Sequence, residues 1–164
     1  NPDRTMPATE LILLRHAHAE PQAAAGTDAE RPLSLRGEAE ADAVAAWLAH
    51  HGLPERVICS PAQRTRQTLA RVLSADGFVD TREDERIYEA TPGDLMDVIA
   101  DHRDCARLML VGHNPGFESL AALLATGQSG DHRGMPPAGI AVLALPRGTE
   151  LEPGCAQLIS FWSP

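Results

Sequence analysis

The sequence predicts an α/β domain, a three-layer α/β/α sandwich with a largely parallel mixed central sheet. Short apolar runs alternate with stretches of helical periodicity, which is typical of a sheet that is covered by helices on both faces. The 164 residues suit a single domain over residues 1–164, large enough to bury well over half of its unfolded surface. No internal repeat or low-complexity tract divides the chain.

The first third of the chain predicts a strand, a helix and a second strand. The apolar run in Glu10–Arg15 predicts the first strand. After a polar loop, a helix is expected from near Ser34 to His51, where Gly52 suits a C-terminal cap. The second strand is expected at Val57–Cys59.

The middle of the chain predicts two helices that begin with a hydroxyl residue and a proline. Ser60–Leu73 is expected to be helical, because serine can cap a helix and proline suits its first position. A weak strand is expected at Phe78–Thr81. The next helix is predicted over Thr91–His102 on the same capping grounds.

The last third predicts a central strand, a helix and a pair of late strands. The strand is expected at Leu108–Val111, and a turn at Asn114–Gly116 leads into a helix over Phe117–Ala125. A loop rich in glycine and proline then separates this helix from two late strands, at Ile140–Leu145 and Gln157–Phe161.

The charge of the chain argues against several classes of partner. All 14 cationic residues are arginines, and 23 carboxylates leave a net charge of −9. The mean field therefore repels nucleic acid and anionic membranes. An anionic substrate would have to be bound by a local group of arginines.

Cysteine usage and the chain start favour a cytoplasmic protein. Cys59, Cys105 and Cys155 have no metal-ligand spacing and an odd count, so neither a disulfide framework nor a zinc site is indicated. No stretch is long and apolar enough to cross a bilayer, and the start lacks the pattern of a signal peptide. Residues 1–6 are expected to be a flexible lead.

Polar residues follow three of the predicted strands at the point where each strand ends. His16, Ser60 and His113 lie just past such ends, and ligands of open α/β sheets bind beyond the carboxyl ends of the strands. With Arg15 and Arg64, the two histidines would form a cluster suited to the oxygens of a phosphoryl group, because arginine binds such anions with two hydrogen bonds at once.

Three short motifs resemble those of one enzyme family. Arg15-His16-Ala17 resembles the Arg-His-Gly signature of the histidine phosphatase (phosphoglycerate mutase-like) superfamily. The block from Ser60 to Thr68 resembles its Ser-Pro-x-x-Arg-x-x-Gln-Thr block, and Gly112–Pro115 resembles its late Gly-His block. The matches occur in family order over about Leu11 to Leu123. The short chain is similar to the SixA-type phosphohistidine phosphatases in particular.

This resemblance implies a fold, a mechanism and a set of catalytic roles. The fold would be phosphoglycerate mutase-like, and the reaction a metal-independent phosphatase reaction without a cofactor. His16 would be the nucleophile that accepts the phosphoryl group, while Arg15, Arg64 and His113 would bind its oxygens. Water would then hydrolyse the phosphohistidine intermediate.

Two positions depart from the family pattern or leave a role open. Gln22 stands where the larger superfamily often has an asparagine that binds phosphate, so we expect a weak substitute contact there. Many members use a glutamate as the general acid, and this chain offers Glu89 or Glu85, of which Glu89 is the better candidate. A chain without such an acid would favour phosphohistidine, because an alkoxide needs a proton more urgently than imidazole does.

Several functions fit these residues. The first is the dephosphorylation of phosphohistidine on a protein, and the second is the hydrolysis of a small phosphomonoester such as a sugar or nucleotide phosphate. A third is a non-catalytic module that binds phosphate, which the presence of both His16 and His113 disfavours. His16 and His18 also resemble a metal-ligand pair, but no further ligands have matching spacing. The loop Gly127–Pro137 is expected to form a mobile rim of the site.

Overall fold

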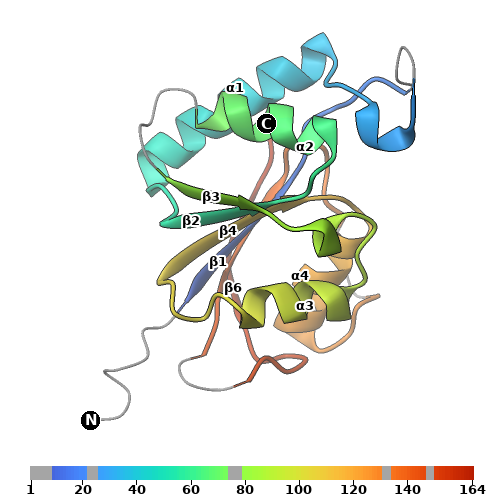
Figure 1. Cartoon of the computed structure of the whole chain (residues 1–164). Helices are drawn as coiled ribbons and strands as arrows, with labels where there is room; N and C mark the ends of the chain where they lie inside the picture. Colours follow the sequence, from blue (N-terminus) through green and yellow to red (C-terminus); the bar gives the residue numbers. More distant parts are fainter. Residues whose placement is uncertain (1–8, 22–25, 74–78, 131–133, 147–149) are drawn as a thin grey trace.

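A six-stranded sheet in the order β3-β2-β4-β1-β5-β6 organises the fold (Figure 1). The computed structural model describes residues 9–21, 26–73, 79–130, 134–146 and 150–164. Strands β1 to β4 run parallel to one another, whereas β5 is antiparallel to both of its neighbours. The strands are β1 (Glu10–Arg15), β2 (Arg56–Cys59), β3 (Asp80–Glu83), β4 (Arg107–Gly112), β5 (Ile140–Ala144) and β6 (Gln157–Trp162). The sheet is therefore mixed and largely parallel, as predicted.

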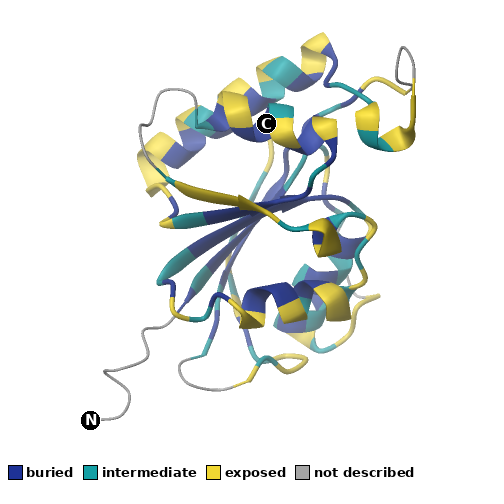
Figure 2. Cartoon of the chain, viewed as in Figure 1, coloured by how far each residue is buried: buried dark blue, intermediate teal, exposed yellow. Residues whose placement is uncertain are grey.

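Helices cover both faces of this sheet, as the sandwich prediction requires. One layer contains α1 (Leu35–His51) and α2 (Gln63–Val72), and the other contains α3 (Pro92–Ala100) and α4 (Gly116–Thr126) (Figure 1). Alternate side chains of β1 point to opposite faces of the sheet and pack against the two helical layers. Ile12 packs in the core beneath α1 and α2, whereas Leu13 packs in the core beneath α3 and α4. Figure 2 shows the central strands buried between two layers of helices whose outer surfaces are exposed.

Capping residues set the ends of α1 and α3. The Ser34 side chain accepts a hydrogen bond from the backbone N–H of Gly37, and α1 stops at Gly52, whose φ of 103° suits glycine. Thr91 forms a capping box with Asp94 at the start of α3. The predicted starts of both helices are confirmed, and α3 ends two residues earlier than predicted.

The start of α2 differs from the prediction. The helix begins at Gln63 and not at Ser60. The Ser60 hydroxyl accepts a hydrogen bond from the backbone N–H of Ala62 at 3.3 Å, and it also forms a hydrogen bond with Nε2 of His113 at 2.8 Å. Ser60 therefore forms a tight turn and a side-chain contact after β2, and the prediction that it caps the helix is wrong.

The remaining elements lie within a few residues of their predicted places. Strand β3 begins at Asp80, later than expected, and Phe78 lies outside the described residues. The late strands β5 and β6 are confirmed. The predicted flexible lead over residues 1–6 lies outside the described residues. Cys59, Cys105 and Cys155 are all free thiols.

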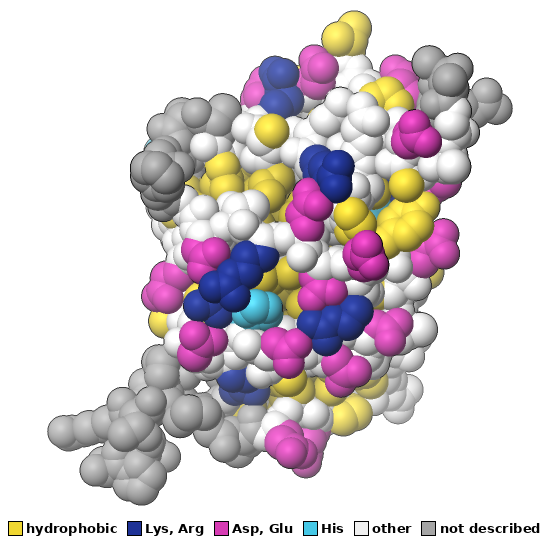
Figure 3. Space-filling model, in the orientation of Figure 1, with side chains coloured by type: hydrophobic (Ala, Val, Ile, Leu, Met, Phe, Trp, Pro, Cys, Tyr) yellow, Lys and Arg dark blue, Asp and Glu magenta, His cyan; other side chains and the backbone are white. Residues whose placement is uncertain are grey.

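The described residues contain no membrane-spanning helix, and several of their arginines pair with carboxylates. Within the described residues, no helix is long and apolar enough to cross a membrane. Figure 3 shows that the arginines on one face lie among acidic side chains. Arg56 pairs with Asp80 and Asp104, and Arg86 pairs with Asp84 and Asp101. These ion pairs neutralise the charges of Arg56 and Arg86 locally.

Candidate active site

Three strand ends bring the candidate residues together. His16 follows β1, Ser60 follows β2 and His113 follows β4. The backbone N–H of His16 donates to Gly112 O at 2.9 Å, and that of Ser60 donates to Val111 O at 3.0 Å. Because β1, β2 and β4 are parallel neighbours, their carboxyl ends meet at one edge of the sheet. The residues expected at this edge thus lie together.

The rings of His16 and His113 lie close together at this edge of the sheet. Their centroids lie 5.3 Å apart with the planes tilted by 58°. Nδ1 of His16 lies 2.7 Å from the carbonyl oxygen of Ala17 and must therefore carry the proton that it donates. This bond leaves Nε2 of His16 as the nitrogen with a free lone pair.

Burial keeps both rings neutral near neutral pH. Desolvation is the main reason why the pKa of His16 is lowered to about 4. The hydrogen bond to Ala17 raises this pKa, and the nearby charges of Arg64, Arg15 and Arg31 lower it. Desolvation, followed by the charge of Arg64, lowers the pKa of His113 to about 3. A neutral His16 ring is the form that can act as a nucleophile.

His113 presents one donor to the site. Its Nε2 lies 2.8 Å from the Ser60 hydroxyl, which already accepts from the backbone N–H of Ala62. The described residues offer the Ser60 hydroxyl proton no other acceptor, so we assign it to Nε2, and a neutral His113 then carries its own proton on Nδ1. This Nδ1 is buried and has no partner among the described residues.

Two arginines add further donors. Arg64 is only 7% exposed, and Arg15 donates from Nη1 to Met135 O at 2.7 Å. The Nε atoms of both side chains are buried without a hydrogen-bond partner in the described part of the chain. Buried donors without partners are costly and rare in folded proteins. Together with Nδ1 of His113, they form a group of donors suited to an anion.

A pocket of about 260 Å³ opens beside His113 and Arg64. Tyr88 lies on its wall, with its ring edge-on to the His113 ring at 5.5 Å. The rest of the lining comes from Glu89, Ala90, Asn114, Pro115 and Gly116. The pocket thus joins Arg64 and His113 to the segment that precedes α3, whereas His16 and Arg15 are not among its lining residues.

The structure separates the two candidate acids. Glu89 lines the pocket and has a φ of 55°, a left-handed conformation that is unusual for a residue other than glycine. Glu85 lies in the short helix η3 (Glu85–Ile87) and is not among the residues that line the pocket. Glu89 is therefore the better placed of the two. Gln22 lies outside the described residues.

The glycine- and proline-rich loop contacts the site through Met135. The carbonyl oxygen of Met135 accepts from Arg15 and from Asn114, and its N–H donates to Glu118. Residues 131–133 of this loop lie outside the described residues. Met135, which is buried, thus attaches the expected rim to the site.

His18 contacts the helix start. Its Nδ1 lies 2.6 Å from the Ser34 hydroxyl, and its carbonyl oxygen accepts from the Ser34 N–H. Gly37 packs so closely that an added Cβ would lie 1.9 Å from the His18 carbonyl oxygen. Within the described ranges, no three histidines, cysteines or carboxylates form a group that could hold a metal ion.

Sequence reasoning missed Asp28 and Tyr88. Asp28 belongs to the short helix η2 (Asp28–Glu30) and contacts Arg64 and Tyr88. In the sequence, Asp28 lies 36 residues from Arg64 and 60 residues from Tyr88, so no short motif predicts these contacts. Asn114, by contrast, directly follows His113 and could have been found from that motif.

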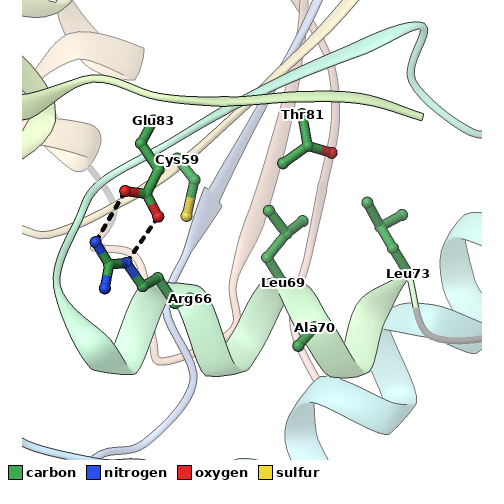
Figure 4. Close-up of a pocket in the computed structure, with 7 residues that line it drawn as sticks. All are labelled: Cys59, Arg66, Leu69, Ala70, Leu73, Thr81 and Glu83. Atoms are coloured by element: carbon green, nitrogen blue, oxygen red, sulfur yellow. Dashed lines mark hydrogen bonds and ion pairs between the residues drawn. The ribbon is translucent and has the colours of Figure 1, made fainter. Parts of the chain in front are cut away.

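A second hollow lies apart from the histidines, between α2 and β3 (Figure 4). Its volume is about 410 Å³, and Leu69, Leu73 and Cys59 line its apolar part. An ion pair between Arg66 and Glu83 lies at one end. None of the phosphoryl-binding candidates lines this hollow.

Comparisons with known proteins identify similar sequences and structures. The model of the histidine phosphatase superfamily (branch 1) matches residues 11–126. The uncharacterized Mycobacterium tuberculosis protein Rv1276c is 38% identical over 148 residues, which cover 84% of this chain and 91% of that protein. A SixA protein of Agrobacterium tumefaciens, to which phosphohistidine phosphatase activity is ascribed, is 31% identical with a TM-score of 0.81, over 96% of this chain and 99% of the other. A protein of Nakamurella multipartitia with the same ascription is 27% identical, with a TM-score of 0.83 and 96% of each chain covered.

Proposed function

The chain belongs to the histidine phosphatase superfamily, branch 1, as a histidine-nucleophile phosphatase, and we propose that it removes the phosphoryl group from phosphohistidine on a protein. The observation that carries the proposal is the state of His16. Its Nδ1 proton is held by Ala17 O, so its Nε2 lone pair is free beside His113 and two arginines.

In the first step, Nε2 of His16 attacks the phosphorus of the substrate. A P–N bond forms to His16 while the bond between phosphorus and the substrate imidazole breaks, and the imidazole nitrogen keeps that electron pair and takes up a proton from solvent. Arg15, Arg64 and His113 offer donors to the oxygens of the transferring group, whose charge they stabilise. These donors are buried in the free protein, so little reorganisation is needed.

In the second step, water attacks the phosphohistidine on His16. The water oxygen bonds to phosphorus as the P–N bond breaks, and the electron pair of that bond returns to Nε2. Inorganic phosphate is released with the water protons, which it shares with solvent. The hydrogen bond from Nδ1 to Ala17 O holds the ring in the same orientation through both steps. The enzyme therefore returns to its starting state without a change of tautomer.

The pocket beside Arg64 and His113 is small and has room for a phosphoryl group carried on a side chain. Pockets that enclose small-molecule ligands usually have volumes of roughly 300 to 1,000 Å³. The pocket here, at about 260 Å³, lies slightly below this range, and His16 is not among the residues that line it. The likeness to the SixA proteins, at 31% and 27% identity, supports the same substrate class.

A small phosphomonoester is the second candidate substrate, and Glu89 favours it. A carboxyl group on the pocket wall could protonate an alkoxide leaving group, which ester hydrolysis needs more than phosphohistidine hydrolysis does. The left-handed backbone at Glu89 supports a functional reason for its position.

Phosphate release tests the proposal directly. The wild type and His16→Ala are assayed in chelator with a phosphohistidine-bearing protein and with an aryl phosphomonoester. We expect faster release from the protein and none from His16→Ala. Release from the ester alone would support the second candidate, and release from neither substrate would refute both.

A further inference from the structure

Asp28 joins three parts of the site rim. One oxygen of its carboxylate accepts from Nη2 of Arg64 at 3.1 Å and from the Tyr88 hydroxyl at 2.6 Å. The other oxygen accepts from Nη1 of Arg31 at 2.8 Å. Asp28 thus connects η2, α2 and the segment before α3.

The contacts with Arg64 involve only one edge of its guanidinium group. Nη1 donates to the Asp28 carbonyl oxygen at 2.9 Å, and Nη2 donates to the Asp28 carboxylate. The other edge contains Nε, which is buried and has no partner within the described part of the chain. A guanidinium group has two such edges, and each can bind an anion with two parallel hydrogen bonds.

We propose that Asp28 is a positioning residue, which holds Arg64 by one edge so that the Nε edge faces the phosphoryl group. This inference rests on the role proposed above for Arg64. Because Arg64 has three further rotatable bonds beyond Cβ, its orientation needs such an anchor. The same carboxylate fixes Tyr88, whose ring packs against His113 and lies on the pocket wall.

The charge of Asp28 suits this role. Hydrogen bonds from Tyr88 and Arg31 hold the pKa of Asp28 well below its usual range, despite a side chain that is 50% exposed. The carboxylate is therefore ionised throughout any practical assay range and acts as a constant acceptor, not as a proton donor. Arg31, Arg64 and Tyr88 donate to the two carboxylate oxygens of Asp28. An asparagine at this position would have only one side-chain oxygen to accept from these three donors.

The test compares Asp28→Asn with a matched control. Asp42→Asn removes an equally charged carboxylate that pairs with Arg71 on the outer surface of α1. Two readouts are used: steady-state phosphate release, and binding of inorganic vanadate as an analogue of the transferring group. Tyr88→Phe removes one of the three hydrogen bonds to the carboxylate and keeps the ring.

We expect Asp28→Asn to lower kcat and the affinity for vanadate about 10- to 100-fold, as the loss of a group that orients a catalytic residue does. Asp42→Asn should stay within about twofold of the wild type. Tyr88→Phe should have a smaller effect than Asp28→Asn, and adding it to Asp28→Asn should lower kcat no further, since that hydrogen bond is already weakened.

Three results would overturn the proposal. Asp28→Asn could retain wild-type kcat and vanadate affinity, or Asp42→Asn could reduce both as much as Asp28→Asn does. If Asp28→Asn does not fold, an unchanged vanadate affinity in Tyr88→Phe would count against it. Vanadate binding needs no turnover, so this test gives an answer even if neither phosphorylated substrate is hydrolysed by the wild type.

Discussion

Lowering the pH from 8 to 5 is expected to destabilise the folded protein through His16 and His113. The His113 ring is buried and the His16 ring is half-buried, and desolvation lowers their pKa values from 6.5 to about 4 for His16 and about 3 for His113, so both rings are neutral. In the unfolded chain the rings bind protons below pH 6.5, whereas in the folded protein they do not until much lower pH. The stability is therefore complete above pH 6.5 and is lost as the pH falls below it.

The size of this effect follows from the pKa values. Each pH unit below 6.5 costs about 1.4 kcal/mol per ring for as long as the native ring stays neutral. At pH 5 the loss is about 2 kcal/mol for each histidine and about 4 kcal/mol for the pair. Both rings are still neutral in the native state at this pH, so repulsion between them does not change the sum.

Urea unfolding at pH 8, 6.5 and 5 measures the effect. His113→Gln removes one titrating ring and keeps a group that can bond to Ser60, so its free energy of unfolding should fall about 2 kcal/mol less between pH 8 and 5. His50→Gln replaces an exposed histidine and should lose as much stability as the wild type. Equal losses in His113→Gln and the wild type would show that His113 is not a buried neutral group.

Three further predictions concern single side chains. Arg64→Ala should lose about 3 to 4 kcal/mol of transition-state stabilisation, measured as a roughly 10²- to 10³-fold lower kcat/KM; a tenfold loss or less would count against its role as a preorganised donor. Glu89→Gln should slow hydrolysis of an aryl ester more than that of phosphohistidine, and equal slowing of the two would refute the leaving-group argument. Gly37→Ala should destabilise the fold by about 1 to 3 kcal/mol in urea unfolding, because its Cβ would meet the His18 carbonyl oxygen, whereas Gly130→Ala, with open space around it, should change little.

Elements with a local physical signature could be predicted from the sequence. The apolar runs of β1 and β4 are fully buried, because parallel strands with helices on both faces need apolar residues at consecutive positions. The capping box of Thr91 and the glycine after α1 likewise act within a few residues of one another. The convergence of His16 and His113 follows from the parallel order of their strands.

Features that depend on distant contacts could not be predicted in this way. Serine is a residue type that often caps helices, but the Ser60 hydroxyl contacts His113, which is 53 residues away in the sequence. The helix α2 therefore starts at Gln63. Asp28 lies in a polar loop and acquires its place through Arg64 and Tyr88. Such side-chain contacts between loops and helices leave no periodic pattern in a single sequence.

The central claim is that His16 carries the phosphoryl group during turnover. The most direct measurement mixes the enzyme with a phosphohistidine-bearing protein, quenches the reaction in alkali, and locates the phosphoryl group by mass spectrometry of the peptides. We predict a transient phosphoryl group on His16 in the wild type, with neither this group nor phosphate release in His16→Ala. Phosphate release by His16→Ala at the wild-type rate would contradict the mechanism.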